Sequence, residues 1–175
     1  DLVIATGFLM KDATEKVAKD FPDVKFALID EVSTLPNVSS LVFAEDQGSF
    51  LVGALAAMMS KTGNVGFVGG MEIPLIQKFQ KGYEMGAKYV NPSIKVGSLY
   101  TSGSNPFNDP VRGKENALSL IKQGADVVYH AAGGTGKGVI DAAVEAKVFA
   151  IGVDSNQDSK AKGTVLDRKS TRLNS

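Results

Sequence analysis

The chain has 175 residues, enough for one domain or two small ones. Its 19 basic and 19 acidic residues balance, so no net field would draw the protein to nucleic acid or to an anionic membrane. The absence of cysteine and the presence of one histidine exclude disulfides, thiolate catalysis, cysteine-ligated zinc and a multi-histidine metal site within this chain.

Both ends of the sequence look cut. The chain opens directly in the apolar run from Leu2 to Ala5, without a methionine and without a basic, apolar leader. A domain that begins inside a buried strand is expected to have lost its upstream part. No stretch approaches the roughly 18 apolar residues that a membrane-spanning helix needs.

The first 43 residues predict a short β-α-β-β segment. Strands are expected at residues 2–5, 24–30 and 41–43, and apolar residues at helical spacing predict a helix that begins near Phe8 and ends before Pro22.

The rest of the chain predicts a larger unit. From Ser49 the pattern is strongly helical and nearly all apolar, so most of that helix should be buried. From Phe67 to Asp154, strands and helices alternate as β-α-β-α-β-α-β, which predicts a parallel, doubly wound α/β sheet with right-handed crossovers. Two α/β units joined near Phe43 to Gly48 form the simplest architecture.

The most distinctive stretch is ADVVYHAAGGTGKG, where a buried strand ends in a dense glycine cluster and a helix follows. The loop's backbone N–H groups and the helix N-terminus are expected to face whatever lies beyond the strand. A P-loop is disfavoured, because Ala131 replaces its first glycine and Gly138 replaces its hydroxyl residue. Gly133 and Gly134 form either a tight turn or a backbone cradle for a neutral polar ligand. Glycine costs chain entropy without helping packing, which favours the cradle.

Asp154 ends a buried strand at the same predicted edge of the sheet. A carboxylate in that place can accept two hydrogen bonds from a vicinal diol, as acidic residues do for ribose in dinucleotide folds. The alternatives are a helix cap and an ion-pair partner.

Other side chains allow two interpretations each. Phe79 either belongs to the core or stacks on a heterocyclic base from the mouth of a cleft. Tyr129 and His130 lie on opposite faces of their strand, and each is either a structural residue or a ligand contact. Glu45 and Asp46 form either a solvated turn or ligand contacts from a hinge. No residue is spaced to make a catalytic triad with the histidine, so no enzyme is expected.

Long words of the sequence resemble the basic membrane protein family of bacterial extracytoplasmic lipoproteins, which includes purine nucleoside receptors. The likeness rests on FAEDQGSFLVGALAAMM, GADVVYHAAGGTGKGV and AIGVDSNQD and runs from about Asp1 to Leu166. It implies a type I periplasmic-binding-protein-like fold, with two doubly wound lobes and a ligand cleft between them. It also implies a receptor without a cofactor that delivers nucleosides to an ABC permease and is held at the cell membrane by a lipid anchor.

The resemblance assigns roles to particular positions. Asp154 matches the position expected to hold the ribose hydroxyls, and Gly133 and Gly134 match the loop that lines the cleft. Phe79 falls where related folds place a ligand contact on the first helix of the second lobe. The candidate ligand-binding residues are Asp154, Gly133, Gly134, Phe79, Gly7, Phe8, Glu45, Asp46 and Tyr129.

The resemblance also predicts the domain organisation. Residues 1–43 are expected to be a remnant of the N-terminal lobe, in which Gly7 and Phe8 match the end of a strand. Residues 44–158 are expected to form the C-terminal lobe, and residues 159–166 to return towards the hinge. The last nine residues, DRKSTRLNS, resemble the translation of a sequencing adapter, and we expect 167–175 to be a non-native tail. A cytosolic ligand-sensing regulator of the same fold and a receptor for sugars or other small solutes remain alternatives.

Overall fold

The computed structural model describes residues 1–155, 157 and 161–169 of the chain. The chain divides into two compact units, residues 1–44 and residues 45–175. Each unit has its own parallel sheet.

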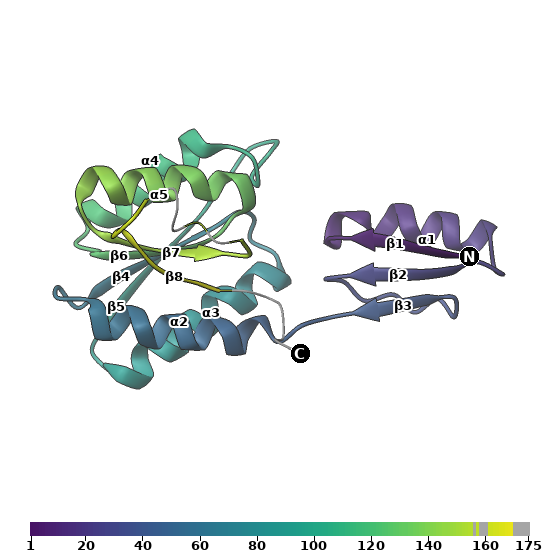
Figure 1. Ribbon diagram of the computed structural model, residues 1–175, viewed down its shortest axis with the longest axis horizontal. Helices are drawn as coiled ribbons and strands as arrows, with labels where there is room; N and C mark the ends of the chain where they lie inside the picture. The colour runs from purple at the N-terminus through teal and green to yellow at the C-terminus, as the bar shows by residue number, and fades with distance from the viewer. Residues whose placement is uncertain (156, 158–160, 170–175) are drawn as a thin grey trace. The chain divides into compact units, whose positions relative to one another are not determined.

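The first unit is a three-stranded parallel sheet covered by one helix (Figure 1). Its core consists of apolar residues from all three strands and the helix, namely Ala5, Ala18, Phe26, Leu28 and Val38. Its elements are β1 (Leu2–Thr6), the 3-10 turn η1 (Phe8–Met10), α1 (Lys11–Asp20), β2 (Lys25–Ile29) and β3 (Val38–Leu41).

The third strand corrects the sequence prediction, which placed it at residues 41–43. The structure has it at Val38–Leu41, because the side chain of Asn37 anchors its start. The side-chain amide of Asn37 donates a hydrogen bond of 2.9 Å to the carbonyl of Ala18, and the backbone carbonyl of Asn37 accepts one of 2.8 Å from the N–H of Phe26. A polar residue that ties a strand to a helix does not stand out from a polar loop in the sequence.

The second unit is a five-stranded sheet in the order β5-β4-β6-β7-β8, and every neighbouring pair is parallel. Helices α2 and α3 cover one face, and α4 and α5 cover the other (Figure 1). The predicted doubly wound α/β architecture is therefore confirmed. The elements are α2 (Glu45–Met59), β4 (Asn64–Gly69), α3 (Pro74–Val90), β5 (Lys95–Tyr100), α4 (Pro110–Lys122), β6 (Val127–Ala131), η2 (Gly133–Thr135), α5 (Gly136–Ala146), β7 (Phe149–Val153) and β8 (Val165–Lys169).

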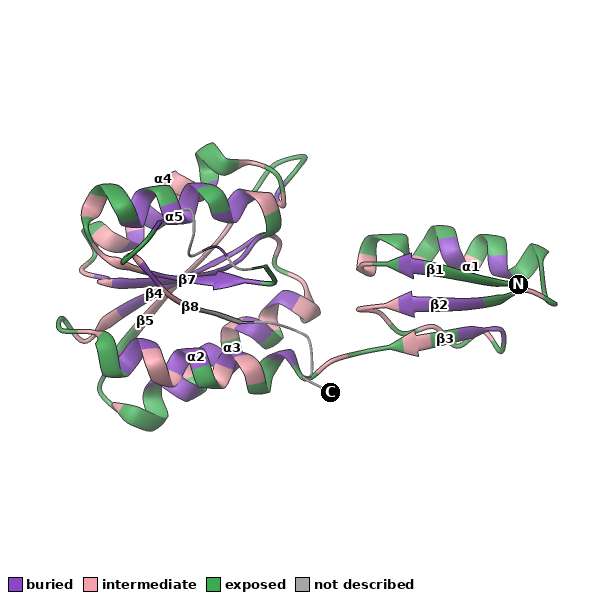
Figure 2. Cartoon of the chain, in the orientation of Figure 1, coloured by how far each residue is buried: buried purple, intermediate pink, exposed green. Residues whose placement is uncertain are grey.

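Two apolar layers hold the helices to this sheet. Alternate strand residues such as Phe67 and Tyr129 face α2 and α3, whereas Val68 and Val128 face α4 and α5. The central strands are buried on both sides, as parallel sheets require (Figure 2).

Two further features differ from the prediction. Helix α2 begins at Glu45 rather than Ser49, because acidic residues suit the positive end of a helix, and its polar first turn lacks the apolar periodicity of the turns that follow. The unforeseen strand β8 pairs with β7 through residues 165–169, so its main chain includes the first residues of the expected tail. Residues 159, 160 and 170–175, on which the predictions for the return segment and the tail also rest, lie outside the described residues.

Helices α2 and α3 are in close contact because two glycines of α3 face the α2 backbone. A Cβ added at Gly82 would lie 2.2 Å from the carbonyl oxygen of Asp46, and one added at Gly86 would lie 1.9 Å from that of Phe50. Both distances are far shorter than van der Waals contact, so only glycine allows this helix spacing.

We therefore expect Gly86→Ala to destabilise the protein. In an unobstructed helix the change would stabilise by up to about 1 kcal/mol. Here the new methyl group meets a backbone carbonyl and must separate the helices, a form of overpacking that costs roughly 1–3 kcal/mol. Urea unfolding of the variant beside the exposed control Lys81→Ala measures the difference. An unchanged or higher midpoint for Gly86→Ala would contradict the close contact.

Candidate functional site

The candidate site is the carboxyl edge of the five-stranded sheet. Because β4 to β7 are parallel, the segments that follow them all emerge at this edge. Each helix that starts there also directs its N-terminal N–H groups towards it. Ligands of open α/β sheets bind outside this edge.

Gly133 and Gly134 follow β6 in the turn η2. Gly133 is exposed and adopts a φ of +54°, in the left-handed region that glycine tolerates best. A Cβ on Gly134 would lie 2.8 Å from the side-chain oxygen of Asn108, so the turn packs tightly against the loop after β5. The N–H of Thr135 donates to the carbonyl of Phe107 at 3.3 Å. This N–H group, which belongs to the backbone expected to face a ligand, is therefore hydrogen-bonded within the protein.

Asp154 follows β7, the neighbour of β6, so it emerges at the same edge as Gly133 and Gly134. Its side chain is exposed, and its φ of +61° places a non-glycine residue in the left-handed region. Such a conformation is uncommon and persists only where the surroundings stabilise it. The structure therefore brings together three of the predicted residues.

Tyr129 and Phe79 lie in the apolar layer under α2 and α3. Tyr129 is fully buried, with its hydroxyl 3.2 Å from that of Ser49 and its ring 5.1 Å from the ring of Tyr83. Burial raises the pKa of Tyr129; the Ser49 hydrogen bond opposes the shift, and the charge of Asp154 adds to it. Phe79 is 7% exposed. These positions fit the core interpretation weighed for both aromatics.

Glu45 and Asp46 occupy the first turn of α2. Glu45 is only 2% exposed, and its carboxylate lies 3.8 Å from the ammonium group of Lys78 on α3. Asp46 is exposed. The buried acid therefore forms an ion pair between the helices, whereas Asp46 faces solvent from the first turn of the helix.

Gly7 and Phe8 belong to the first unit, at the end of β1. Gly7 has a φ of +96°, and its N–H donates to the carbonyl of Ile29 at 3.1 Å. Phe8 opens the 3-10 turn η1 and is partly exposed.

Sequence reasoning missed Phe107, the aromatic side chain of the loop after β5. This partly buried ring packs against Gly70, where an added Cβ would lie 2.3 Å from it, and the Phe107 backbone contacts Gly133. The sequence did offer a signal for it, because Phe107 is the lone aromatic residue of the Gly/Pro-containing loop between Thr101 and Pro110. Loops of this length often carry functional residues.

Thr135 holds this loop against η2. Its buried hydroxyl donates to the carbonyl of Pro106 and accepts from the N–H of Asp109, both at 2.8 Å. Both bonds tie the Phe107 loop to the glycine turn, so one side chain joins two segments of the edge.

We expect Thr135→Val to destabilise the protein by roughly 1–3 kcal/mol, because it leaves the Asp109 N–H and the Pro106 carbonyl without their partner. The matched control is Thr101→Val, since the buried hydroxyl of Thr101 has no hydrogen-bond partner among the described residues and its loss should be nearly neutral. Urea unfolding and amide exchange at Asp109 measure both effects. Equal losses in the two variants would refute the assignment.

His130 is fully buried on the other face of β6, against Gly136 of α5. Its Nε2 lies 3.2 Å from Oε1 of Gln157, whereas its Nδ1 has no hydrogen-bond partner among the described residues. Burial lowers its pKa from 6.5 to about 4, and the bond to Gln157 opposes the shift. His130 is therefore neutral and structural at physiological pH.

The shift makes stability pH-dependent. Below pH 6.5 the unfolded chain binds a proton that the folded protein rejects until about pH 4. The free energy of unfolding should therefore fall by roughly 3 kcal/mol across this window as pH decreases. His130→Gln, which keeps every carboxyl group, should show a shallower decline in urea unfolding between pH 7 and 4. Parallel curves for the two proteins would contradict the shift.

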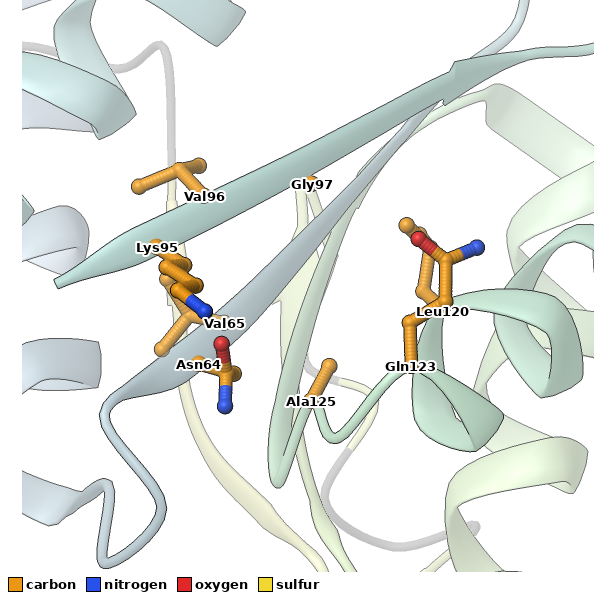
Figure 3. Close-up of a pocket in the computed structure, with 8 residues that line it drawn as sticks. All are labelled: Asn64, Val65, Lys95, Val96, Gly97, Leu120, Gln123 and Ala125. Carbon is orange, nitrogen blue, oxygen red and sulfur yellow. The ribbon is translucent and has the colours of Figure 1, made fainter.

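A pocket of about 170 Å³ lies at the opposite edge of the sheet, near the amino ends of β4 and β5 (Figure 3). Asn64, Lys95 and Gln123 contribute its polar groups, and the buried Leu120 contributes apolar surface. This position is not where doubly wound sheets bind ligands, so the pocket is separate from the candidate site.

Other kinds of site find no support within the part of the chain that the structure describes. There, no three histidine, cysteine, aspartate or glutamate residues gather where they could hold a metal ion. The described helices include none with the length and apolar character needed to cross a bilayer.

Solved structures define the class of the protein. The chain matches an ABC transporter solute-binding protein from Aeropyrum pernix K1 with a TM-score of 0.85 and 34% identity, over 95% of this chain and 49% of that one. It also matches a transcriptional activator of the comK gene from Bacillus halodurans, with a TM-score of 0.80 and 27% identity, over 94% of this chain and 56% of that one. The fold is that of type I periplasmic-binding-protein-like structures, and the class is that of substrate-binding proteins rather than enzymes.

The sequence identifies the family. Residues 1–167 match the Bmp family model, described as ABC transporter substrate-binding protein PnrA-like. The ABC transporter nucleoside-binding protein BmpA of Lactococcus lactis subsp. cremoris (strain MG1363) is 40% identical over 181 residues, which cover 98% of this chain and 51% of that protein. The chain therefore belongs to the Bmp family of ABC transporter substrate-binding proteins and spans about half the length of the curated relatives it matches.

Proposed function

We propose that the protein is a membrane-anchored, extracytoplasmic receptor that binds purine nucleosides and passes them to an ABC permease. The observation that carries this proposal is the carboxyl edge of the second unit. There, the exposed carboxylate of Asp154 and the glycine turn at Gly133 and Gly134 follow neighbouring parallel strands. The name of the Lactococcus relative supports nucleosides as the ligand class.

The chemistry of the edge suits a nucleoside. Asp154 supplies two carboxylate oxygens, which can accept hydrogen bonds from both hydroxyls of a ribose diol. The partly exposed ring of Phe107 supplies a flat apolar surface on which a heterocyclic base can stack. With Phe79 buried in the core, Phe107 takes over the stacking role in this proposal.

A cytosolic ligand-sensing regulator is the second candidate, favoured by the match to the comK activator. The two functions require different segments before β1. A receptor needs a lipoprotein signal, whereas a regulator needs a DNA-binding domain or a short cytosolic start. Labelling of the full-length protein with a fatty acid in its native cell supports the receptor, and its recovery bound to DNA supports the regulator.

Calorimetry of the full-length protein tests the ligand class. Inosine, guanosine and adenosine are expected to bind, and cytidine and ribose to bind more weakly, because they lack the purine base or any base. A response to ribose alone would favour a sugar receptor. No response to any nucleoside would overturn the proposal.

We expect Asp154→Asn to weaken nucleoside binding by about tenfold or more, because charge-assisted hydrogen bonds contribute roughly 1.5–3 kcal/mol. Asparagine is chosen because it tolerates the left-handed conformation of this residue, so the fold should persist. Free purine bases should bind the variant and the wild type equally. The exposed Asp141→Asn is the control, and an equal loss for nucleosides and bases would remove Asp154 from this role.

A further inference from the structure

The turn that carries Asp154 is closed by the side chain of Gln157. The Oε1 atom of Gln157 accepts a hydrogen bond of 3.0 Å from the N–H of Val153, the last residue of β7. The same atom lies 3.2 Å from Nε2 of His130 on β6. Gln157 therefore joins the end of β7 to the neighbouring strand, and Asp154 lies in the turn that it closes.

These contacts determine which atoms carry protons. A backbone N–H can only donate, so the Gln157 atom that faces Val153 must be the carbonyl oxygen rather than the amide nitrogen. A carbonyl oxygen can only accept, so Nε2 of His130 must carry the hydrogen. His130 is thereby assigned to the Nε2–H tautomer, and the two donors use both lone pairs of Oε1.

The surroundings of Gln157 fit its side chain closely. Gln157 is 7% exposed and His130 is fully buried, so water does not compete for either bond. A Cβ on Gly152 would lie 2.5 Å from Oε1 of Gln157, so a larger residue there would push the amide away. Within the turn, Asp154 has a φ of +61°, a conformation that needs support from its surroundings.

We propose that Gln157 and His130 are positioning residues for ligand recognition, because Gln157 holds the Asp154 turn in its left-handed conformation and His130 orients the Gln157 amide. Neither residue contacts the ligand in this arrangement. The inference rests on the proposed function, in which Asp154 binds the ribose hydroxyls. It attributes the preference for ligands with ribose hydroxyls to Gln157 and His130, two buried residues that support Asp154.

The test compares inosine with 2′,3′-dideoxyinosine, which lacks the hydroxyls, by calorimetry on the full-length protein. Gln157→Met keeps the side-chain volume and removes the acceptor. Its dissociation constant for inosine should rise about tenfold, while that for the dideoxy analogue should stay within about twofold. The control is Gln123→Met, the same substitution at an exposed residue at the opposite edge, which should change neither constant.

Two further measurements separate positioning from general loss of structure. Gln157→Glu keeps an acceptor at the same reach and should retain the preference for inosine at neutral pH. In the wild type, ¹⁵N chemical shifts of the His130 ring should report a protonated Nε2 and a bare Nδ1. Equal losses for both ligands in Gln157→Met, or a protonated Nδ1, would overturn the inference. Failure of the wild type to bind any nucleoside would instead remove the proposed function, and the inference with it.

Discussion

Parallel pairing of the strands is the constraint on which the rest of the second unit depends. A parallel strand cannot be reached by a tight turn, so each connection between β4, β5, β6 and β7 crosses the sheet through a helix, and these helices cover both faces. The same pairing brings the ends of β4, β5, β6 and β7 to one edge. The candidate site therefore follows from the way the scaffold is connected.

Buried polar contacts then determine the shape of this edge. Thr135 binds the loop after β5 to the glycine turn, and Gln157 joins the end of β7 to His130. Each contact is buried, and a buried polar group without a hydrogen-bond partner is costly. One arrangement of these segments is therefore strongly preferred. The groups proposed to meet a ligand, the exposed Asp154 and the partly buried Phe107, belong to segments that these contacts hold in place.

Packing on the α2 and α3 side explains why some candidate residues serve the fold instead. The glycines of α3 allow the two helices to approach closely, and the layer beneath them is filled by Phe79 and by the hydroxyl-paired Tyr129. Aromatic rings in such a layer stabilise the unit by burying large apolar surfaces. The ion pair of Glu45 with Lys78 adds a polar link between the same helices.

The sequence by itself determined the alternation of strands and helices, the parallel class of the sheet and the place of Gly133, Gly134 and Asp154 after their strands. These features depend on local periodicity and on turn residues, which are visible along the chain. Tertiary structure alone decided that Phe79 and Tyr129 are buried, that Phe107 lies beside the glycine turn and that β3 begins after Asn37. It also decided that Gln157 reaches His130, 27 residues away. Such contacts join segments distant in sequence, and their partners become known only when the strands are paired and the helices are packed on them.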